Sequence, residues 1–557
     1  QSTLKTFRKH DMPYGPSEAA ALQWQALCAI VLGGFPLCTF EDPEMLILFG
    51  MMHSTAPAIM PIGKVVRGQL LDEAVVDVEL KTTKALKNKN VGLTNGWKCK
   101  KKDAVNAICV NVEFRLYLIE LIEVTALNKD GPSQCELFTQ MIDCVEVKHG
   151  CIIIYFTTDA DGRSKKGRIF LGKKRPWLIL PLCWAHQFQL ILGDYFKVND
   201  MAARIAEEAT ALIAWINNHS KVRKLFDQSQ AIISQDRNAG RIIILAYLVT
   251  NLTRWTTHFV AFLQLFMLRP ALQLAVLQKC SAIIAAEVSA ATSTKAECLR
   301  EDAEKFCILI EDPTFWNGLE VVLGDLEPIC LGTNINQKDF TRLDQVLLTL
   351  AGIFLHFADE EEKVEVKMKM LICLEKRWKD YDQPVFLVAL ILNPFEKLFC
   401  FGPNTNLNQF KCLNLLISLH HRMKGHPDNT DTPEQKKVKE NEVSKLFMQY
   451  LSGTGDFVDF NLLACSELAL FQENVDPIQV WETLTDSGHL AKLAGFAIMI
   501  LHIVANQVGC ECTFSRTKIE QSDHCNRLGL EKIDKQTKVL QYFLSETYDT
   551  QYILCAI

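Results

Sequence analysis

The stretch that most constrains this chain of 557 residues runs from Cys151 to Arg163, where a short apolar segment gives way to acidic residues. The five consecutive apolar residues from Ile152 to Phe156 are rich in β-branched types, which is typical of a fully buried strand. Asp159 follows at the carboxyl end of this predicted strand. Ligands and metals bind at that edge of an open α/β sheet. Asp159 is therefore the first candidate for chemistry, and the alternative is that it only caps a helix starting near Arg163.

Strand-like segments lie on both sides of this stretch. Three β-type runs precede it, over 91–94, 104–112 and 114–125, and four-residue apolar spacing predicts a helix from Ser133 to about His149. After Asp159 come a basic helical segment and the apolar run 177–182. This order of three strands, a helix, a strand, a helix and a strand predicts a mixed α/β sheet.

Helical periodicity dominates the rest of the chain, so the protein is expected to be mostly helical overall. The predicted organisation is a helical N-terminal region over 1–90, the first part of the sheet core over 91–197, an all-α insertion over 198–480, and closing core helices over 481–557. Within the insertion, one helix is expected over Gly240–Phe266. The polar stretch Lys424–Asn441 is expected to be a mobile linker or exposed loop.

A helix is also expected over Gly495–Phe514, and it carries the second acidic candidate. Leu501, Val504, Val508 and Glu511 are spaced by three, four and three residues, which places them on one helical face. Glu511 ends this apolar stripe. It either turns toward water or points into a site beside the sheet.

Composition limits the classes of protein that this chain can belong to. The net charge of −6 excludes a polycation that coats nucleic acid, so any contacts with phosphates are local. The 20 cysteines are scattered and form no CxxC pair, which suits a reducing cell interior. The apolar run Leu493–Leu501 is far shorter than the roughly 20 residues that span a bilayer, and no membrane partner is expected.

Two basic clusters are either solvated faces or phosphate contacts. The first includes Lys100, Lys101 and Lys102. The second follows Asp159 and comprises Arg163, Lys165, Lys166, Arg168, Lys173, Lys174 and Arg175.

Five short motifs occur in an order that resembles the hAT superfamily of DNA transposases. They are Leu93-Thr-Asn95-Gly-Trp97, Thr158-Asp159, Cys183-Trp-Ala-His186, Thr253-Arg254-Trp255-Thr256 and Cys510-Glu511-Cys-Thr-Phe514-Ser515. The order, the approximate spacing and the long helical interruption all match, and the similarity covers essentially the whole chain. The closing segment resembles the hAT dimerisation region.

The resemblance implies an RNase-H-like core that a large α-helical insertion interrupts. Members of the family use an Asp, Asp, Glu triad to bind two divalent metals for in-line phosphoryl transfer, and oxygen ligands of this kind suit Mg²⁺ or Mn²⁺. Carried over by position, Asp159 is the second acid and Glu511 the third, and these two are the implied metal ligands. The first acid is replaced by Asn95, which keeps the shape but loses the negative charge. Asp103 is a conceivable substitute, eight residues further on.

The resemblance also assigns roles outside the triad. His186 lies close to the active site in the family, and Cys183 with His186 is at most half of a zinc site. Arg254 and Trp255 are implied to hold a phosphate and stack on an extruded base; the alternative is a helix-packing Trp covered by an Arg stem. Relatives often carry an upstream zinc finger, but no such Cys/His pattern occurs in these residues.

Three functions are therefore open. The first is a transposase-derived nuclear protein that dimerises or forms a higher oligomer and binds transposon-end DNA, with cleavage impaired because of Asn95. The second is an active metal-dependent transposase, in which Asn95 ligates through its amide oxygen or Asp103 substitutes. The third is a dimerising scaffold that binds no DNA.

Overall fold

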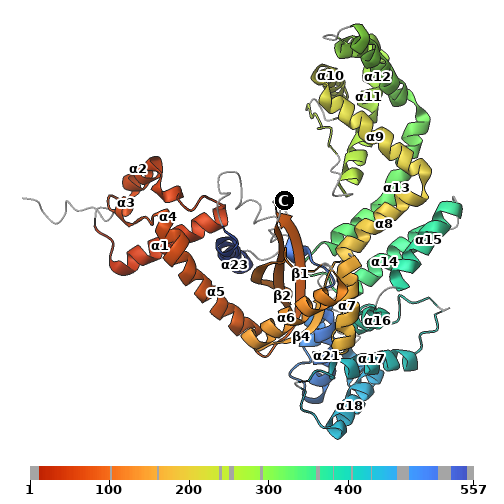
Figure 1. Cartoon of the computed structure of the whole chain (residues 1–557). Helices are drawn as coiled ribbons and strands as arrows, with labels where there is room; N and C mark the ends of the chain where they lie inside the picture. Colours follow the sequence, from red (N-terminus) through yellow and green to blue (C-terminus); the bar gives the residue numbers. More distant parts are fainter. Residues whose placement is uncertain are drawn as a thin grey trace, which may run out of the picture. The chain divides into compact units, whose positions relative to one another are not determined.

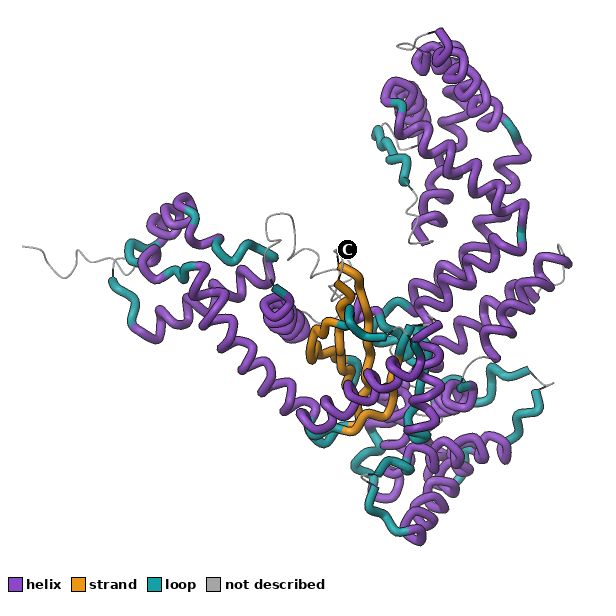
Figure 2. Tube along the Cα trace, viewed as in Figure 1, coloured by secondary structure: helices purple, strands orange, loops and turns teal. Residues whose placement is uncertain are grey.

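The computed structural model describes residues 12–100, 103–128, 130–159, 162–237, 241–249, 256–288, 293–358, 364–379, 382–402, 405–427, 429–460, 476–511 and 529–547. The described chain is mostly helical and contains one four-stranded mixed sheet (Figures 1 and 2). This part of the expected fold class is confirmed. Two compact units are present. Unit 1 comprises Gln1–Cys183, Lys338–Gln345 and Asp382–Ile557, and unit 2 comprises Trp184–Gln337 and Val346–Tyr381.

Unit 1 begins with short helices, as their start and stop signals predict. They are α1 (Pro16–Gly33), η3 (Thr39–Glu41), α2 (Pro43–Met52), α3 (Ala56–Ile59), α4 (Gly63–Val65), the π-helical turn η4 (Val66–Leu70) and α5 (Leu71–Leu86). The side chain of Asp42 accepts a hydrogen bond from the backbone N–H of Glu44 at 2.9 Å. Together with the proline at the first helical position, this cap starts α2 at Pro43.

The sheet has the strand order β3-β2-β1-β4. Its strands are β1 (Asn90–Lys100), β2 (Asp103–Val112), β3 (Arg115–Glu123) and β4 (Ile152–Thr157). β1, β2 and β3 pair antiparallel, whereas β4 joins β1 in parallel after the crossover helix α6 (Gly131–His149). The predicted strands are therefore confirmed in number and order up to Asp159. The expected end of the first strand at residue 94 is wrong, because the pairing of β1 with β2 continues to Lys100 and places Asn95 within the strand.

The apolar run 177–182 lies along the free edge of β4, after the helix α7 (Gly162–Lys174). It makes two isolated parallel bridges, Tyr155 with Ile179 and Thr158 with Leu182. The N–H of Phe156 donates to the carbonyl of Ile179 at 2.9 Å. The segment thus takes the place of a fifth strand, although it is not continuously paired.

Each face of the sheet is covered by a different helix. On one face, Leu93 and Phe156 pack with α6 residues such as Phe138 and Ile142 in a fully buried core. On the other, buried β2 and β3 residues pack against Cys510 and against α23 (Leu530–Thr547). Val539 and Leu540 of α23 also enter the core of the N-terminal helices, so the last described helix joins that region to the sheet within unit 1.

The remaining helices of unit 1 are α16 (Gln383–Leu392), α17 (Gln409–Met423), α18 (Pro433–Ser452), η5 (Gly455–Phe457), α20 (Pro477–Glu482), η6 (Gly488–Leu490) and α21 (Ala491–Leu501). The expectation that Lys424–Asn441 is a linker or loop is wrong for its second half. A capping box between Thr432 and Gln435 begins α18. These two local hydrogen bonds stabilise the start of a helix in a stretch whose polar composition predicted a loop.

The segment Lys338–Gln345 belongs to unit 1 through buried polar contacts. The carboxylate of Asp344 is fully buried and accepts hydrogen bonds from Arg342 Nε at 3.0 Å and from Asn393 Nδ2 at 2.8 Å. Arg342 also pairs with Asp476 at 3.3 Å. One ionic network therefore joins three segments that are distant in sequence.

Unit 2 is all helical in its regular structure, with α8 (Trp184–Val198), α9 (Asp200–Asn218), α10 (Ser220–Arg237), α11 (Thr256–Val288), α12 (Ser293–Glu311), α13 (Pro313–Asn336), most of α14 (Leu343–Ala358) and α15 (Val364–Lys379). The helix expected over Gly240–Phe266 is wrong for residues 241–249, which have no regular structure. Side chains of α10 bind this backbone instead. Gln230 Oε1 accepts from the N–H of Leu245 at 2.9 Å, and Ser234 Oγ accepts from that of Ile243 at 2.7 Å.

Among the described helices, α11 alone has the length and apolar composition that crossing a membrane would require. The apolar window that meets this test has a mean hydropathy of 1.7, and 44% of it is buried within the protein. Its buried residues include Phe262, Leu265 and Leu272.

Candidate functional site at the end of the sheet

The candidate site lies where β1 and β4 pair in parallel. Thr94 is the register partner of Thr157, so Asn95 and Asp159 lie on neighbouring chains at the same end of the sheet. Asn95 is only 7% exposed, whereas Asp159 is half-buried just beyond the last residue of β4. The two positions that the sequence singled out are therefore brought together by the strand pairing.

The C-terminal segment returns to the same end of the sheet. The hydroxyl of Thr157 donates to the carbonyl of Val504 at 3.0 Å. Thr94 Oγ1 and Cys510 Sγ lie 3.3 Å apart, both buried. Glu511 follows Cys510 and is exposed. Residues 416 positions apart in the chain thus meet beside Asn95.

The path of this segment differs from the expected continuous helix. α21 ends at Leu501, and a short helical turn resumes only at Val508. Between them, Val504 forms an antiparallel bridge with Arg342, and Asn506 donates to the carbonyl of Lys338. The expectation that Leu501, Val504, Val508 and Glu511 share one helical face is therefore wrong, because tertiary hydrogen bonds replace helical ones.

Gly509 allows the resumed turn to lie flat against the sheet. A Cβ atom at this position would lie 2.2 Å from a methyl carbon of Leu116 in β3, so the leucine side chain would have to move to accommodate it. The absence of a side chain therefore lets Cys510 reach Thr94. The sequence alone gave no sign of this role.

Arg168 is a second residue of the site that sequence reasoning misread. It belongs to the basic cluster that the sequence predicts to be either a solvated face or a phosphate contact, yet it is only 7% exposed on α7. Its Nη1 donates to the hydroxyl of Thr158 and to the backbone carbonyl of Asp159, the latter at 2.9 Å. A buried guanidinium therefore holds the backbone that presents Asp159.

The three proposed acid positions are close in backbone but not arranged on one face. Side chains alternate along a strand, so Asn95 projects on the same face as Leu93, toward α6 and α7. Thr94 projects on the opposite face, where it meets Cys510. A shared site would have to form across the end of the sheet, with Asp159 beyond the end of β4.

The donor set here is one amide oxygen and two carboxylates, which is one negative charge fewer than two divalent metals are expected to require. No group of three or more His, Cys, Asp and Glu suited to a metal occurs among the described residues. Asp103 does not restore the charge at this place. It begins β2 five residues before Ile108, the register partner of Asn95, so its backbone lies about 17 Å away along the strand.

The other predicted residues are placed separately. His186 is the third residue of α8 and is half-buried in unit 2. Cys183 is buried in unit 1, and its N–H donates to the carbonyl of Thr158 at 3.0 Å. Arg254, Trp255, Lys101 and Lys102 lie outside the described residues, as does the side chain of Lys100.

Lys165 and Lys166 are exposed on α7, the helix that follows Asp159. Arg163 is exposed on the same helix. By contrast, Arg175, from the same predicted cluster, pairs with Asp143 and lies 3.6 Å from Glu146. Only part of the second basic cluster can therefore contact an external phosphate.

The arrangement as a whole brings one buried amide, two carboxylates and exposed cations near the end of β4. Comparison with models of known protein families and with curated proteins found no match for this chain.

Proposed function

We propose that this chain derives from a DNA transposase of the hAT type and acts as a self-associating DNA-binding protein in the nucleus, with its strand-cleaving activity impaired. The observation that carries the proposal is the meeting of Thr94 with Cys510 beside the carboxyl end of β4. It joins the regions of three motifs, around Asn95, Asp159 and Glu511, that are widely separated in sequence. A chance resemblance of short motifs does not require such a meeting.

An RNase-H-like core belongs to this proposal. Supporting it are three antiparallel strands followed by β4, which adds in parallel beside β1, and the segment 177–182 beyond β4. Helices α6 and α7 fall between these strands in the expected order. The helical unit 2 then interrupts the chain before its last part returns to the sheet.

Impaired cleavage follows from the chemistry of Asn95. If a divalent metal such as Mg²⁺ or Mn²⁺ bound here, Asp159 and Glu511 would supply its anionic ligands and Asn95 only a neutral oxygen. A bound metal would supply charge stabilisation for phosphoryl transfer. With one carboxylate missing, we expect weak metal binding and little cleavage.

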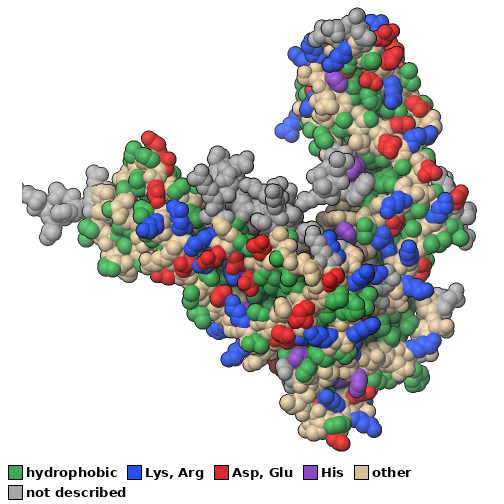
Figure 3. Space-filling model, in the orientation of Figure 1, with side chains coloured by type: hydrophobic (Ala, Val, Ile, Leu, Met, Phe, Trp, Pro, Cys, Tyr) green, Lys and Arg blue, Asp and Glu red, His purple; other side chains and the backbone are tan. Residues whose placement is uncertain are grey.

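DNA binding is expected to be local, because acidic and basic side chains are interspersed on the face of the protein shown in Figure 3. The exposed cations of α7, Lys165 and Lys166, are the described residues best suited to phosphate contacts. The role of Lys100, Lys101 and Lys102 rests on their clustering in the sequence. The roles of Arg254, Trp255 and His186 rest on the resemblance. So do the transposon-end target and self-association through the closing segment.

Cleavage is tested with duplex DNA carrying the terminal repeats of the element, incubated with Mg²⁺ or Mn²⁺. We expect no nicking or joining by the natural chain and a gain of activity with Asn95→Asp. The control is the double variant Asn95→Asp with Asp159→Ala, which should be inactive. Substantial cleavage by the natural chain that is lost with Asp159→Ala would instead support an active transposase.

DNA binding is tested separately by measuring affinity against salt concentration. Phosphate contacts should make the logarithm of the binding constant fall linearly with that of the salt concentration, by about 0.9 per neutralised phosphate. Replacing Lys165 and Lys166 by alanine should reduce this slope. Absence of binding at low salt, in a chain that still self-associates, would favour the scaffold.

A further inference from the structure

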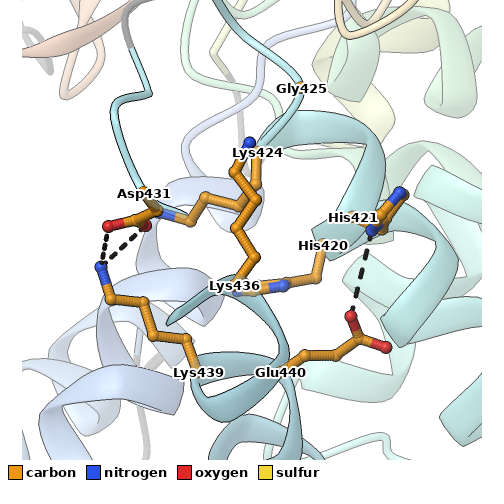
Figure 4. A pocket seen from close by; sticks show the side chains of 8 residues that line it. All are labelled: His420, His421, Lys424, Gly425, Asp431, Lys436, Lys439 and Glu440. Carbon is orange, nitrogen blue, oxygen red and sulfur yellow. Dashed lines mark hydrogen bonds and ion pairs between the residues drawn. The ribbon is translucent and has the colours of Figure 1, made fainter. Parts of the chain in front are cut away.

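A hollow of about 70 Å³ lies between the end of α17 and the start of α18 in unit 1. It is built from the stretch that sequence composition suggested was a linker. The lining residues are His420, His421, Lys424, Gly425, Asp431, Lys436, Lys439 and Glu440 (Figure 4).

Two of the acidic and basic side chains at the hollow already neutralise each other, and Glu440 has a histidine neighbour. Lys439 pairs with Asp431 at 2.7 Å. Glu440 lies 3.9 Å from His421. Figure 4 shows these two pairs on opposite sides, with the side chains of Lys424 and Lys436 between them.

Lys424 and Lys436 are the uncompensated charges of the hollow. Neither ammonium group forms an ion pair with a carboxylate of the described residues, although both lie close enough to lower the pKa of Asp431, after the larger effect of Lys439. Two adjacent cations without partners attract an anion. Lys424 is exposed and Lys436 half-buried, so both can be reached from solvent.

His420 supplies a neutral donor at the base of the hollow. His420 is only 7% exposed, and its ring packs edge-on against Phe496 with ring centroids 5.2 Å apart. Its ring nitrogens have no hydrogen-bond partner among the described residues. Burial, and then the charges of Lys424 and His421, lower its pKa to about 4. At neutral pH the imidazole is therefore uncharged and can donate one N–H to an anion.

A second, larger hollow of about 220 Å³ adjoins the first and shares His420 and Lys424 with it. Its other walls are largely apolar or aromatic and include Trp177, Met423 and Phe496. A ligand whose anionic group binds between the lysines therefore has room for an attached organic group on the other side of His420.

We propose that this region binds a small phosphate monoester, with the phosphate held by Lys424, Lys436 and His420 and its organic group in the adjoining hollow. Phosphate fits the observations because it offers several acceptor oxygens to donors that converge from different elements. The hollow is enclosed by two helices and a loop, which suits a small molecule better than a polymer. This inference is independent of the proposed transposase ancestry.

The test is titration calorimetry of the full chain with inorganic phosphate and with adenosine monophosphate, at constant ionic strength. Both should bind saturably, and the nucleotide should bind more tightly if its organic group uses the second hollow. Replacing Lys424 or Lys436 by alanine should weaken binding roughly tenfold or more, as expected for loss of a charge-assisted hydrogen bond. Lys437→Ala is the matched control, because Lys437 is exposed on α18 and does not line the hollow.

A second readout is the NMR titration of the His420 ring, whose pKa should rise when phosphate binds, because an anion stabilises the protonated form. Equal affinity for phosphate and the nucleotide would support the phosphate site and overturn the role of the second hollow. Absence of saturable binding at millimolar ligand, or binding that the lysine variants leave unchanged, would overturn the proposal. So would a duplex DNA that binds through these lysines when neither small molecule does.

Discussion

His149 provides a sharp test of how the sheet and the N-terminal helices are held together. It lies in the last turn of α6, is only 2% exposed, and its Nδ1 is 2.8 Å from the hydroxyl of Thr83 in α5. Its Nε2 is buried without a partner among the described residues. Protonating the ring would therefore place a positive charge and an unpaired N–H in the interior.

The pKa of His149 is lowered from 6.5 to about 4, chiefly by burial and then by the charge of Lys148. A histidine whose pKa is lower in the folded state binds more protons when unfolded, between about pH 6.5 and pH 4. Stability is therefore fully present above pH 6.5 and is lost as the pH falls through this window. From these two pKa values, the loss between pH 8 and pH 5 is about 2 kcal/mol.

The measurement is urea unfolding of the natural chain and of His149→Asn at several pH values between 8 and 5. Asparagine can retain a polar atom near the position of Nδ1 but cannot be protonated in this range. Hydrogen exchange of the β1 and β4 amides reports on unit 1 alone. Whatever packing the variant loses at neutral pH, its stability should fall less with acid than that of the natural chain, by about 2 kcal/mol between pH 8 and pH 5.

A matched control is His421→Asn, because the side chain of His421 is 77% exposed and meets water in both states. Burial also lowers the pKa values of His420 and His502, and their contributions cancel when each variant is compared with the natural chain. Equal acid sensitivity of the natural chain and His149→Asn would refute the reasoning. A larger loss of stability with acid in His149→Asn than in the natural chain would contradict the predicted direction of the effect.

Two further predictions concern the buried polar contacts of unit 1, each measured as the free energy of unfolding in urea. Arg168→Leu should destabilise the protein by about 2–4 kcal/mol, because two or more charge-assisted hydrogen bonds to the end of β4 are lost, whereas Arg163→Leu on the exposed side of α7 should change stability by less than about 0.5 kcal/mol. Asp344→Ala should cost about 3–5 kcal/mol, because Arg342 and Asn393 are left without their shared acceptor. Losses below about 1 kcal/mol in either buried variant would contradict these assignments.

The strands near Asp159 could be predicted because local signals agree with tertiary structure there. The apolar run Ile152–Phe156 forms a strand, as its composition predicts. It is not fully buried as expected, because Ile152 and Ile154 are half-buried whereas Ile153, Tyr155 and Phe156 are buried. Ser133–His149 forms nearly all of α6, because its apolar spacing matches the face that packs on β1 and β4. These local patterns do not predict that Asn95 lies near Asp159. That expectation rested on the motif resemblance.

Side-chain roles were less predictable, because charge alone does not reveal burial. Arg168 has the same local setting as Lys166, two residues earlier, yet the helix turns one inward and the other outward. Polar composition likewise suggested a loop over 424–441, but it does not distinguish a mobile segment from the capped start of α18. The hollow at His420 was missed for this reason.

The break after Leu501 shows why the last part of the site could not be predicted from spacing. A helix rises 1.5 Å per residue, so an unbroken helix would carry Glu511 about 15 Å beyond Leu501 along a straight axis. Instead, the chain leaves the helix and gives the carbonyl of Val504 to the hydroxyl of Thr157, 347 residues earlier in sequence. The turn resumed at Val508 then lies against the sheet and places Cys510 beside Thr94. Periodicity counts only neighbours along the chain, whereas this turn in direction is determined by partners hundreds of residues away.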